Sequence, residues 1–183
     1  MTHNKILTFG FDDCEIYDRR LCDLFRKYHM KSTFFLISEQ LSFKCEFHRY
    51  GEDTVVERVS PEEIRTTYAG MEVATHTANH RCPVDDLENT VVNSAKYLSD
   101  LCGYPVNGMA YPGGDYTKQH IQKLNELGIL YARTTKSTHG FDLPTQLLEW
   151  HPTCKCDDPD ISDIVDRFLK YEGNEPALWY IYG

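Results

Sequence analysis

Two pairs of side chains in this sequence have the types and the spacing that bind metal ions and move protons. Asp12 and Asp13 are adjacent and follow directly on the apolar run 6–11. His76 and His80 are four residues apart, so on one helical turn both imidazoles would point at the same spot. Two histidines with one carboxylate suit a zinc-type ion and leave coordination positions open for water and substrate. The chemistry predicted is metal-assisted hydrolysis.

Each pair also has a simpler explanation. The adjacent aspartates can cap the helix that must follow them, and a chain with eight histidines can contain an i, i+4 pair by chance. The position of both pairs, each directly after a predicted strand, favours the catalytic interpretation. A bound divalent ion lowers the pKa of its water toward ~7, which supplies hydroxide at neutral pH. One carboxylate would then bind the metal while its neighbour takes the proton.

A third segment that can take part in chemistry is 109–116, with the sequence Met-Ala-Tyr-Pro-Gly-Gly-Asp-Tyr. Its two glycines predict a tight turn that opens a helix. Backbone N–H groups at such a turn can face a developing oxyanion. A turn required only for its geometry explains Gly113 and Gly114 equally well, so both explanations stand at this point.

The rest of the sequence predicts the elements that position these segments. Seven short runs rich in β-branched and aromatic residues predict buried strands. They are 6–11, 33–37, 71–74, 108–111, 130–133, 147–150 and 177–182. Apolar residues recur with helical periodicity within 21–28, 84–98 and 161–168. Ser60, followed by proline and two glutamates, predicts a capped helix start, and Gly103 and Gly128 predict helix ends.

Strands and helices alternate nearly throughout, which predicts parallel strands joined by right-handed crossovers. A seven-stranded βα barrel and an open doubly wound sheet both satisfy this pattern. In either fold, chemistry collects at the carboxyl ends of the strands, where the aspartate and histidine pairs are placed. Residues 134–147 are predicted to be a polar loop. Residues 38–60 are predicted to be an irregular excursion on the surface, placed to form a rim over the site.

The three chemical segments, in this order, resemble the first three motifs of the polysaccharide deacetylase family, or NodB homology domain. The resemblance implies an α/β fold, a distorted (β/α)7 barrel similar to a TIM barrel. It implies Asp12 as the catalytic base and Asp13, His76 and His80 as ligands of a divalent metal. Zinc is the favoured ion, with cobalt, nickel or iron as alternatives. The substrate implied is an acetylated carbohydrate that loses an N- or O-acetyl group by hydrolysis.

The sequence departs from the later motifs of that family. The arginine that usually orients the base is absent from 110–113, although the backbone N–H of Gly113 can still serve as the oxyanion donor. Arg133, at the end of the fifth predicted strand, is a candidate replacement, and an ordinary surface arginine is the alternative. Asp142 and Trp150 have the residue types of the fourth motif at poor spacing, so no role is transferred to them.

The histidine that follows the last strand in the family, its proposed general acid, is also missing. The sequence ends with Leu-Trp-Tyr-Ile-Tyr-Gly at 178–183. We therefore expect a single domain over residues 1–183 that has been shortened at its C-terminal end. Otherwise His151 or His139 would have to serve as the acid, or the protein would be inactive.

The composition of the chain limits which classes of binding partner are expected. A net charge of -9 and a pI near 5.3 argue against nucleic acid or an anionic membrane surface. The run 6–11 is too short for a secretory signal or a membrane helix, so a cytoplasmic chain is expected. Seven scattered cysteines predict reduced thiols. Among them, Cys154 and Cys156 could be metal ligands but are better explained as loop cysteines.

Three functions are therefore distinguished. The first is a metal-dependent deacetylase acting on an acetylated sugar or polysaccharide. The second is an inactive, metal-containing carbohydrate-binding module, which the missing arginine and final histidine favour. The third is a metal amidase acting on a non-sugar amide, because the chemistry at the carbonyl would be the same. The sequence contains no signal for the oligomeric state.

Overall fold

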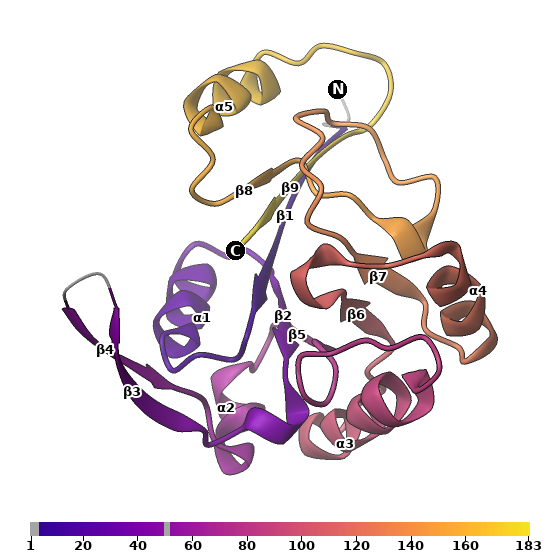
Figure 1. Ribbon diagram of the computed structural model, residues 1–183. Helices are drawn as coiled ribbons and strands as arrows, with labels where there is room; N and C mark the ends of the chain where they lie inside the picture. The colour runs from indigo at the N-terminus through magenta and orange to yellow at the C-terminus, as the bar shows by residue number, and fades with distance from the viewer. Residues whose placement is uncertain (1–3, 50–51) are drawn as a thin grey trace.

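The computed structural model describes residues 4–49 and 52–183 and centres on one sheet of seven parallel strands (Figure 1). The strands are β1 (Lys5–Asp12), β2 (Thr33–Leu36), β5 (Glu72–Thr75), β6 (Gly108–Ala110), β7 (Tyr131–Arg133), β8 (Cys154–Lys155) and β9 (Ala177–Tyr182). Their order across the sheet is β7-β6-β5-β2-β1-β9-β8. The sheet curls into a half-barrel with β7 and β8 at its edges. The fold is a distorted (β/α)7 barrel, as predicted.

β1 lies inside the sheet, between β2 and β9, and the two aspartates stand at its end. Its ladder with β9 ends where Gly10 lies opposite Tyr182. Its ladder with β2 lies nearer the carboxyl end and pairs Asp12 with Phe35. Because all seven strands are parallel, their carboxyl ends lie at the same end of the half-barrel. The end of β1 is therefore flanked by the ends of β2 and β9.

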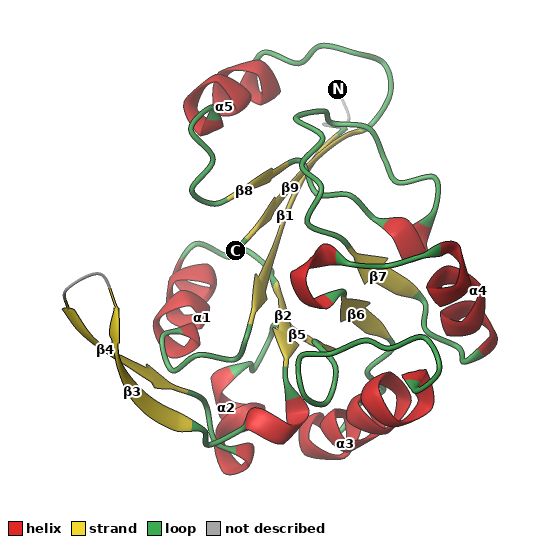
Figure 2. Ribbon diagram, in the orientation of Figure 1, coloured by secondary structure: helices red, strands yellow, loops and turns green. Residues whose placement is uncertain are grey.

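Helices cover the outer face of the sheet (Figures 1 and 2). They are α1 (Asp18–Lys27), α2 (Ile64–Thr67), α3 (Asn93–Cys102), α4 (Lys118–Glu126) and α5 (Ile161–Leu169). The start predicted at Ser60 is confirmed as a capping box with Glu63, which opens a 3-10 turn before α2. Gly103 and Gly128 follow α3 and α4 with φ angles of 81°, as predicted for helix ends. None of the helices in the described residues is long and apolar enough to cross a bilayer.

Alternate strand residues face two different cores. In β2, Phe34 packs outward among residues of α1, α2 and α3, whereas its neighbour Phe35 points into the half-barrel beside Ala74 and Ala110. The inner layer is continued by aromatic rings, since Trp150 packs edge-on against Tyr131 and Tyr180. The interior of the half-barrel is therefore a packed layer of small and aromatic residues below the site.

The strand predicted at 147–150 is wrong. This segment forms a 3-10 turn, at the start of which the side chain of Gln146 accepts a hydrogen bond from the N–H of Leu148. Trp150 then pairs with β7 through an isolated bridge to Arg133. The seventh strand is instead β8, which is two residues long and pairs with β9. So short a strand has no apolar run that sequence patterns can detect.

The segment 38–60 is more regular than predicted. β3 (Lys44–Arg49) and β4 (Glu52–Glu57) form an antiparallel pair that projects from the body of the protein (Figure 1). The two strands pair only with each other and lie outside the core, so charged residues can stand where a buried strand would need apolar ones. By contrast, residues 134–146 carry no helix or strand, as predicted.

Candidate functional site

Asp12 and Asp13 end β1 without capping a helix. α1 begins only at Asp18, and its N-terminus has no side-chain cap hydrogen bond. The backbone of the aspartates is held by the neighbouring strands. The N–H of Asp12 donates to the carbonyl of Gly183 at 2.9 Å, and the N–H of Asp13 donates to the carbonyl of Phe35 at 3.1 Å. The capping explanation is therefore wrong, and both carboxylates are presented at the carboxyl end of the sheet.

His76 and His80 converge through a turn, whereas a helical turn was predicted. Within the turn, Thr77 and His80 have positive φ angles of 69° and 62°. Threonine hydroxyls stabilise this conformation. The N–H of Thr77 donates to Oγ1 of Thr75, and the N–H of Arg81 donates to Oγ1 of Thr77. The left-handed conformations of Thr77 and His80 reverse the chain direction, so that the imidazole of His80 lies beside that of His76, with ring centroids 4.9 Å apart.

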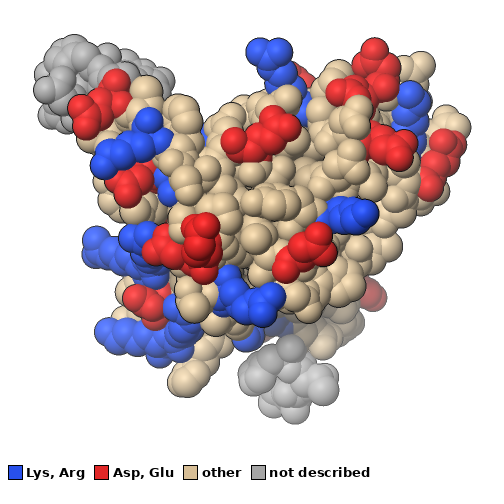
Figure 3. Space-filling view, turned by 90° about the horizontal axis from the view of Figure 1, so that it is seen from below, with Lys and Arg blue, Asp and Glu red and all other residues tan. Residues whose placement is uncertain are grey.

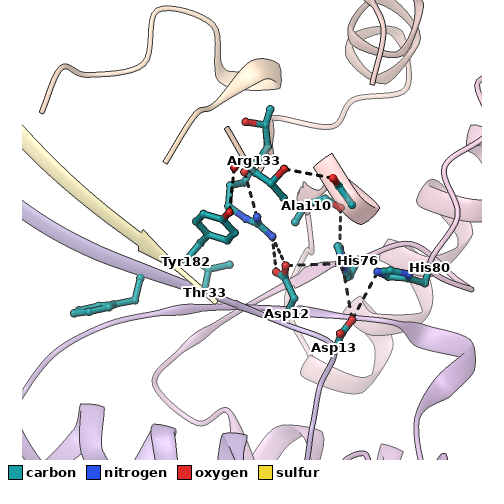
Figure 4. Close-up of polar contacts among 12 residues, drawn as sticks. Asp12, Asp13, Thr33, His76, His80, Ala110, Arg133 and Tyr182 are labelled. Atoms are coloured by element: carbon teal, nitrogen blue, oxygen red, sulfur yellow. Dashed lines mark hydrogen bonds and ion pairs between the residues drawn. The ribbon is translucent and has the colours of Figure 1, made fainter. Parts of the chain in front are cut away.

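Asp13, His76 and His80 face one another at the ends of β1 and β5 (Figure 4). Asp13 Oδ1 is 3.9 Å from Nε2 of each histidine, which is too long for a hydrogen bond. Zinc holds such ligands at about 2.0–2.2 Å, so a slight contraction would place all three on one ion. Asp13 Oδ1 is also buried and lacks a hydrogen-bond partner among the described residues. A lone carboxylate oxygen that faces two imidazole nitrogens fits a cation.

The imidazole of His76 is oriented by the neighbouring strand. Its Nδ1 lies 2.9 Å from the carbonyl oxygen of Ala110 at the end of β6, an acceptor that requires Nδ1 to carry the proton. Nε2, with its lone pair, is then directed at Asp13. Burial lowers the pKa of His76, and the nearby Asp12 opposes this effect. A buried, neutral imidazole is the form that binds a metal. The side chain of His80 is 45% exposed, so the site opens to solvent beside it.

Asp12 forms an ion pair with Arg133 next to the cluster of Asp13, His76 and His80. Nη2 of Arg133 lies 2.5 Å from both carboxylate oxygens of Asp12. The guanidinium is fully buried, and its Nη1 donates to the carbonyl of Thr134 at 3.2 Å. The alternative of an ordinary surface arginine is therefore wrong. That Arg133 orients the base stays a prediction, which this contact supports.

The turn with the two glycines is closed by its own hydrogen bonds. The N–H of Gly114 donates to the carbonyl of Tyr111 at 2.9 Å. Gly113 has a φ of 64°, in the region that favours glycine. At Gly114 a Cβ atom would lie 2.0 Å from Oγ1 of Thr135, so a side chain is excluded there. Geometry alone accounts for the glycines, and the oxyanion role of the Gly113 N–H stays a prediction.

The two histidines considered as replacement acids are engaged elsewhere. Nδ1 of His151 is 2.7 Å from Oγ1 of Thr134. Nε2 of His139 is 2.9 Å from Asp158 and forms an ion pair with it when protonated. Neither contact involves the aspartates or histidines of the candidate site.

Sequence reasoning missed two contributors, the carbonyl of Ala110 and the side chain of Tyr182. Ala110 carries no chemical group that a motif search could detect. Tyr182 lies at the end of the last strand, with its ring centroid 4.9 Å from the guanidinium carbon of Arg133. The alternation of β9 could have indicated its orientation, but its contact with Arg133 depends on the register between strands distant in sequence.

The model of the family described as polysaccharide deacetylase matches residues 1–132. None of the curated proteins compared is similar enough in sequence to count as a relative.

Three solved structures illustrate the similarity of fold. The Streptococcus pyogenes deacetylase PplD, in complex with acetate, is 21% identical with a TM-score of 0.63, over 78% of this chain and 61% of that one. A polysaccharide deacetylase from Bacillus cereus is 20% identical with a TM-score of 0.61, over 78% and 44%. IcaB from Ammonifex degensii is 18% identical with a TM-score of 0.71, over 88% and 72%. The alignments thus cover less than two thirds of the first two proteins.

Proposed function

Because this chain belongs to the polysaccharide deacetylase family, we propose that it is a metal-dependent hydrolase that removes acetyl groups from an N- or O-acetylated sugar. The observation that carries the proposal is the cluster of Asp13, His76 and His80, whose ligand atoms lie within 4.8 Å of one another beside Asp12. Two imidazoles and a carboxylate favour zinc, with cobalt, nickel or iron as alternatives.

Each residue of the site has a proposed part in this reaction. Asp13, His76 and His80 would hold the ion, which supplies Lewis acidity and an activated water when it is bound. Asp12, which keeps 19% of its side chain exposed, accepts the proton of the attacking water as general base. Arg133 keeps the Asp12 carboxylate in one orientation. The N–H of Gly113 would donate to the oxyanion of the tetrahedral intermediate.

The surface charge supports a neutral substrate. On the face shown in Figure 3, Lys and Arg side chains are interspersed with Asp and Glu around an area without charged side chains. Acidic side chains stand beside the basic ones on this face, and the net charge of -9 would repel an anionic polymer. A neutral acetylated saccharide avoids that repulsion.

The proposal is tested by acetate release from a panel of N-acetylated and O-acetylated oligosaccharides, with acetylated non-sugar amides in parallel. Release should stop after chelation, return with added zinc, and fall by about 10²–10⁴-fold in Asp12→Asn, the usual contribution of a general base. Absence of both metal binding and release in the wild-type chain would refute the proposal. Hydrolysis of the amides alone would move the substrate class away from sugars.

A second candidate is a metal-containing module that binds acetylated carbohydrate without hydrolysing it. The observation in its favour is that His151 and His139, the two histidines considered as general acids, bond to Thr134 and Asp158. Such a module would bind the oligosaccharides in titration calorimetry and release no acetate. Release that disappears in Asp12→Asn rules it out.

A further inference from the structure

Arg133 carries a positive charge in an unusual environment, because its side chain is fully buried at the end of β7. Its Nη2 contacts Asp12 and its Nη1 donates to Thr134. Its Nε is buried and has no hydrogen-bond partner among the described residues. Hydrogen bonds therefore restrain one edge of the guanidinium and leave the rest of the plane to be held in another way.

Two aromatic rings supply that restraint. The guanidinium carbon lies 5.2 Å from the ring centroid of Phe35. It lies 4.9 Å from the ring centroid of Tyr182, which is labelled beside Arg133 in Figure 4. Both distances are within the range of cation–π attraction, which strengthens when water is excluded. A planar guanidinium can stack on aromatic faces in a way that an ammonium group does not match. Phe35 is itself fixed in the inner core.

Tyr182 also has a fixed position at its other end. Its hydroxyl donates to the carbonyl of Thr135 at 3.0 Å. Oγ1 of Thr135 lies 3.4 Å from the carbonyl of Gly113, and the same side chain packs where a Cβ of Gly114 would be. The ring thus contacts the arginine next to Asp12, and the hydroxyl contacts the segment that packs on the glycine turn.

We propose that Tyr182 is a positioning residue of the hydrolytic site: its ring holds the Arg133 guanidinium in the plane that orients Asp12, and its hydroxyl holds Thr135 against the Gly113–Gly114 turn. The catalytic consequence rests on the proposed function. The restraint of Arg133 does not, because it follows from contacts within this chain. Tyr182 itself contacts none of the proposed metal ligands.

Two substitutions distinguish the contribution of the Tyr182 ring from that of its hydroxyl. Tyr182→Leu removes both, so the arginine can tilt. A misplacement of about 1 Å can cost about 10²-fold in turnover, and we expect a fall in kcat of that order. KM and zinc affinity should stay within about a factor of two, because neither the metal ligands nor ground-state binding is changed. Tyr182→Phe keeps the ring and should recover most of the lost kcat.

The matched control is Tyr131→Phe. Tyr131 lies on β7 with Arg133 and packs inside the half-barrel, but at the opposite end of the strand, where its hydroxyl is 2.8 Å from Oε1 of Glu72. Its loss should lower stability without changing kcat. If Tyr182→Leu is insoluble, Tyr182→Met, whose flexible side chain can fill an irregular space without a ring, replaces it. An unchanged kcat in the soluble ring-less variant would overturn the catalytic part of the proposal.

A measurement that does not need activity tests the restraint itself. In NMR spectra of the wild-type chain, the Nε–H of Arg133 should exchange slowly and be shifted by the currents of the two rings. Arg133→Lys assigns the signal by removing it. The slow exchange should persist in Tyr182→Phe and be lost in the ring-less variant. An identical Nε–H signal in the wild type, Tyr182→Phe and the ring-less variant would refute the proposed restraint of Arg133 by the ring. Lack of acetate release by the wild type, with the expected NMR result, would instead refute the proposed function alone.

Discussion

The two sides of the candidate site differ in whether their carboxylate already has a cationic partner. On the side proposed to bind the ion, called the metal side below, Asp13 faces His76 and His80 at 3.9 Å, and its buried oxygen has no hydrogen-bond partner among the described residues. On the base side, Asp12 and Arg133 are in contact at 2.5 Å, with the cation buried between two rings. The metal side therefore holds three ligand atoms with lone pairs and no cation in the described part of the chain to accept them. The base side already contains both charges of an ion pair.

This difference indicates what each side needs from outside the chain. Three ligand atoms held together without hydrogen bonds gain stability when a cation enters, so the metal side should respond to added ion. The base side should gain less from an ion, because Arg133 already neutralises Asp12. Changes on the metal side should therefore alter metal affinity and activity together. Changes on the base side should alter activity and stability while the metal stays bound.

The largest effect is expected for His76→Ala, which removes the buried ligand. Loss of a partner outside the ligand shell typically costs about 10–100-fold in metal affinity, and loss of a ligand should cost more than that. Titration of zinc against a chromophoric chelator measures the affinity, and acetate release should fall to background. Zinc should raise the Tm of the wild type and leave that of the variant unchanged.

His151→Ala is the control, because its imidazole contacts Thr134 and lies outside the ligand set. It should bind zinc as the wild type does. Wild-type zinc affinity in His76→Ala would show that the metal side uses other donors, and the contrast between the two sides would fail.

The next effect is expected for Arg133→Met, which keeps a long side chain and removes the charge. Because the base loses its orientation, kcat should fall by about 10²-fold or more, within the contribution of general base catalysis. Removing one partner of a buried pair costs about 3–5 kcal/mol of unfolding free energy, and less is expected here because Asp12 keeps contact with water. Urea unfolding measures this cost. Loss of zinc binding in the same variant would contradict the separation of the two sides.

The fold was predictable where strands are buried and helices separate them. The runs around β2 and β9 are apolar on both faces, since one face meets the helices and the other meets the inner core, and such strands are evident in a sequence. β8 was missed because its two residues, Cys154 and Lys155, form no pattern. The β3–β4 pair was missed because its strands are charged and stabilise each other outside the core.

Within the site, residue types were predictable and contacts were not. Asp12, Asp13, His76 and His80 were recognised because each pair follows a predicted strand. The turn that brings His80 back depends on left-handed φ angles at Thr77 and His80, which no periodicity encodes. The contact of Arg133 with Tyr182 depends on the pairing of β1 with β9, strands about 170 residues apart, and register of this kind is set by the packed sheet.

A third carboxylate extends the comparison and gives the smallest predicted effect. Asp18, at the start of α1, is more deeply buried than Asp12, and its partner is the hydroxyl of Tyr68 at 2.7 Å instead of a cation. Burial raises the pKa of Asp18 from 3.8 to about 7, and the hydrogen bond from Tyr68 opposes this effect. A carboxyl group with a neutral partner is therefore predicted to stay protonated where an exposed one would ionise.

The folded chain then binds a proton that the unfolded chain releases between about pH 4 and pH 7. This contribution to stability is complete below about pH 4 and is lost as the pH rises through about 7. Between pH 5 and pH 7 the loss should be about 2–3 kcal/mol, at about 1.4 kcal/mol per pH unit. Asp18→Asn, which resembles the protonated carboxyl group, should remove this dependence, so the unfolding free energies of the two proteins in urea should be similar near pH 5 and diverge as the pH rises and the wild type alone loses stability. In Tyr68→Phe, which lacks the opposing hydrogen bond, the loss should extend to higher pH. Parallel stability curves for wild type and Asp18→Asn from pH 5 to pH 7 would show that Asp18 is ionised without a cation partner, and burial would then not be what distinguishes it from Asp12.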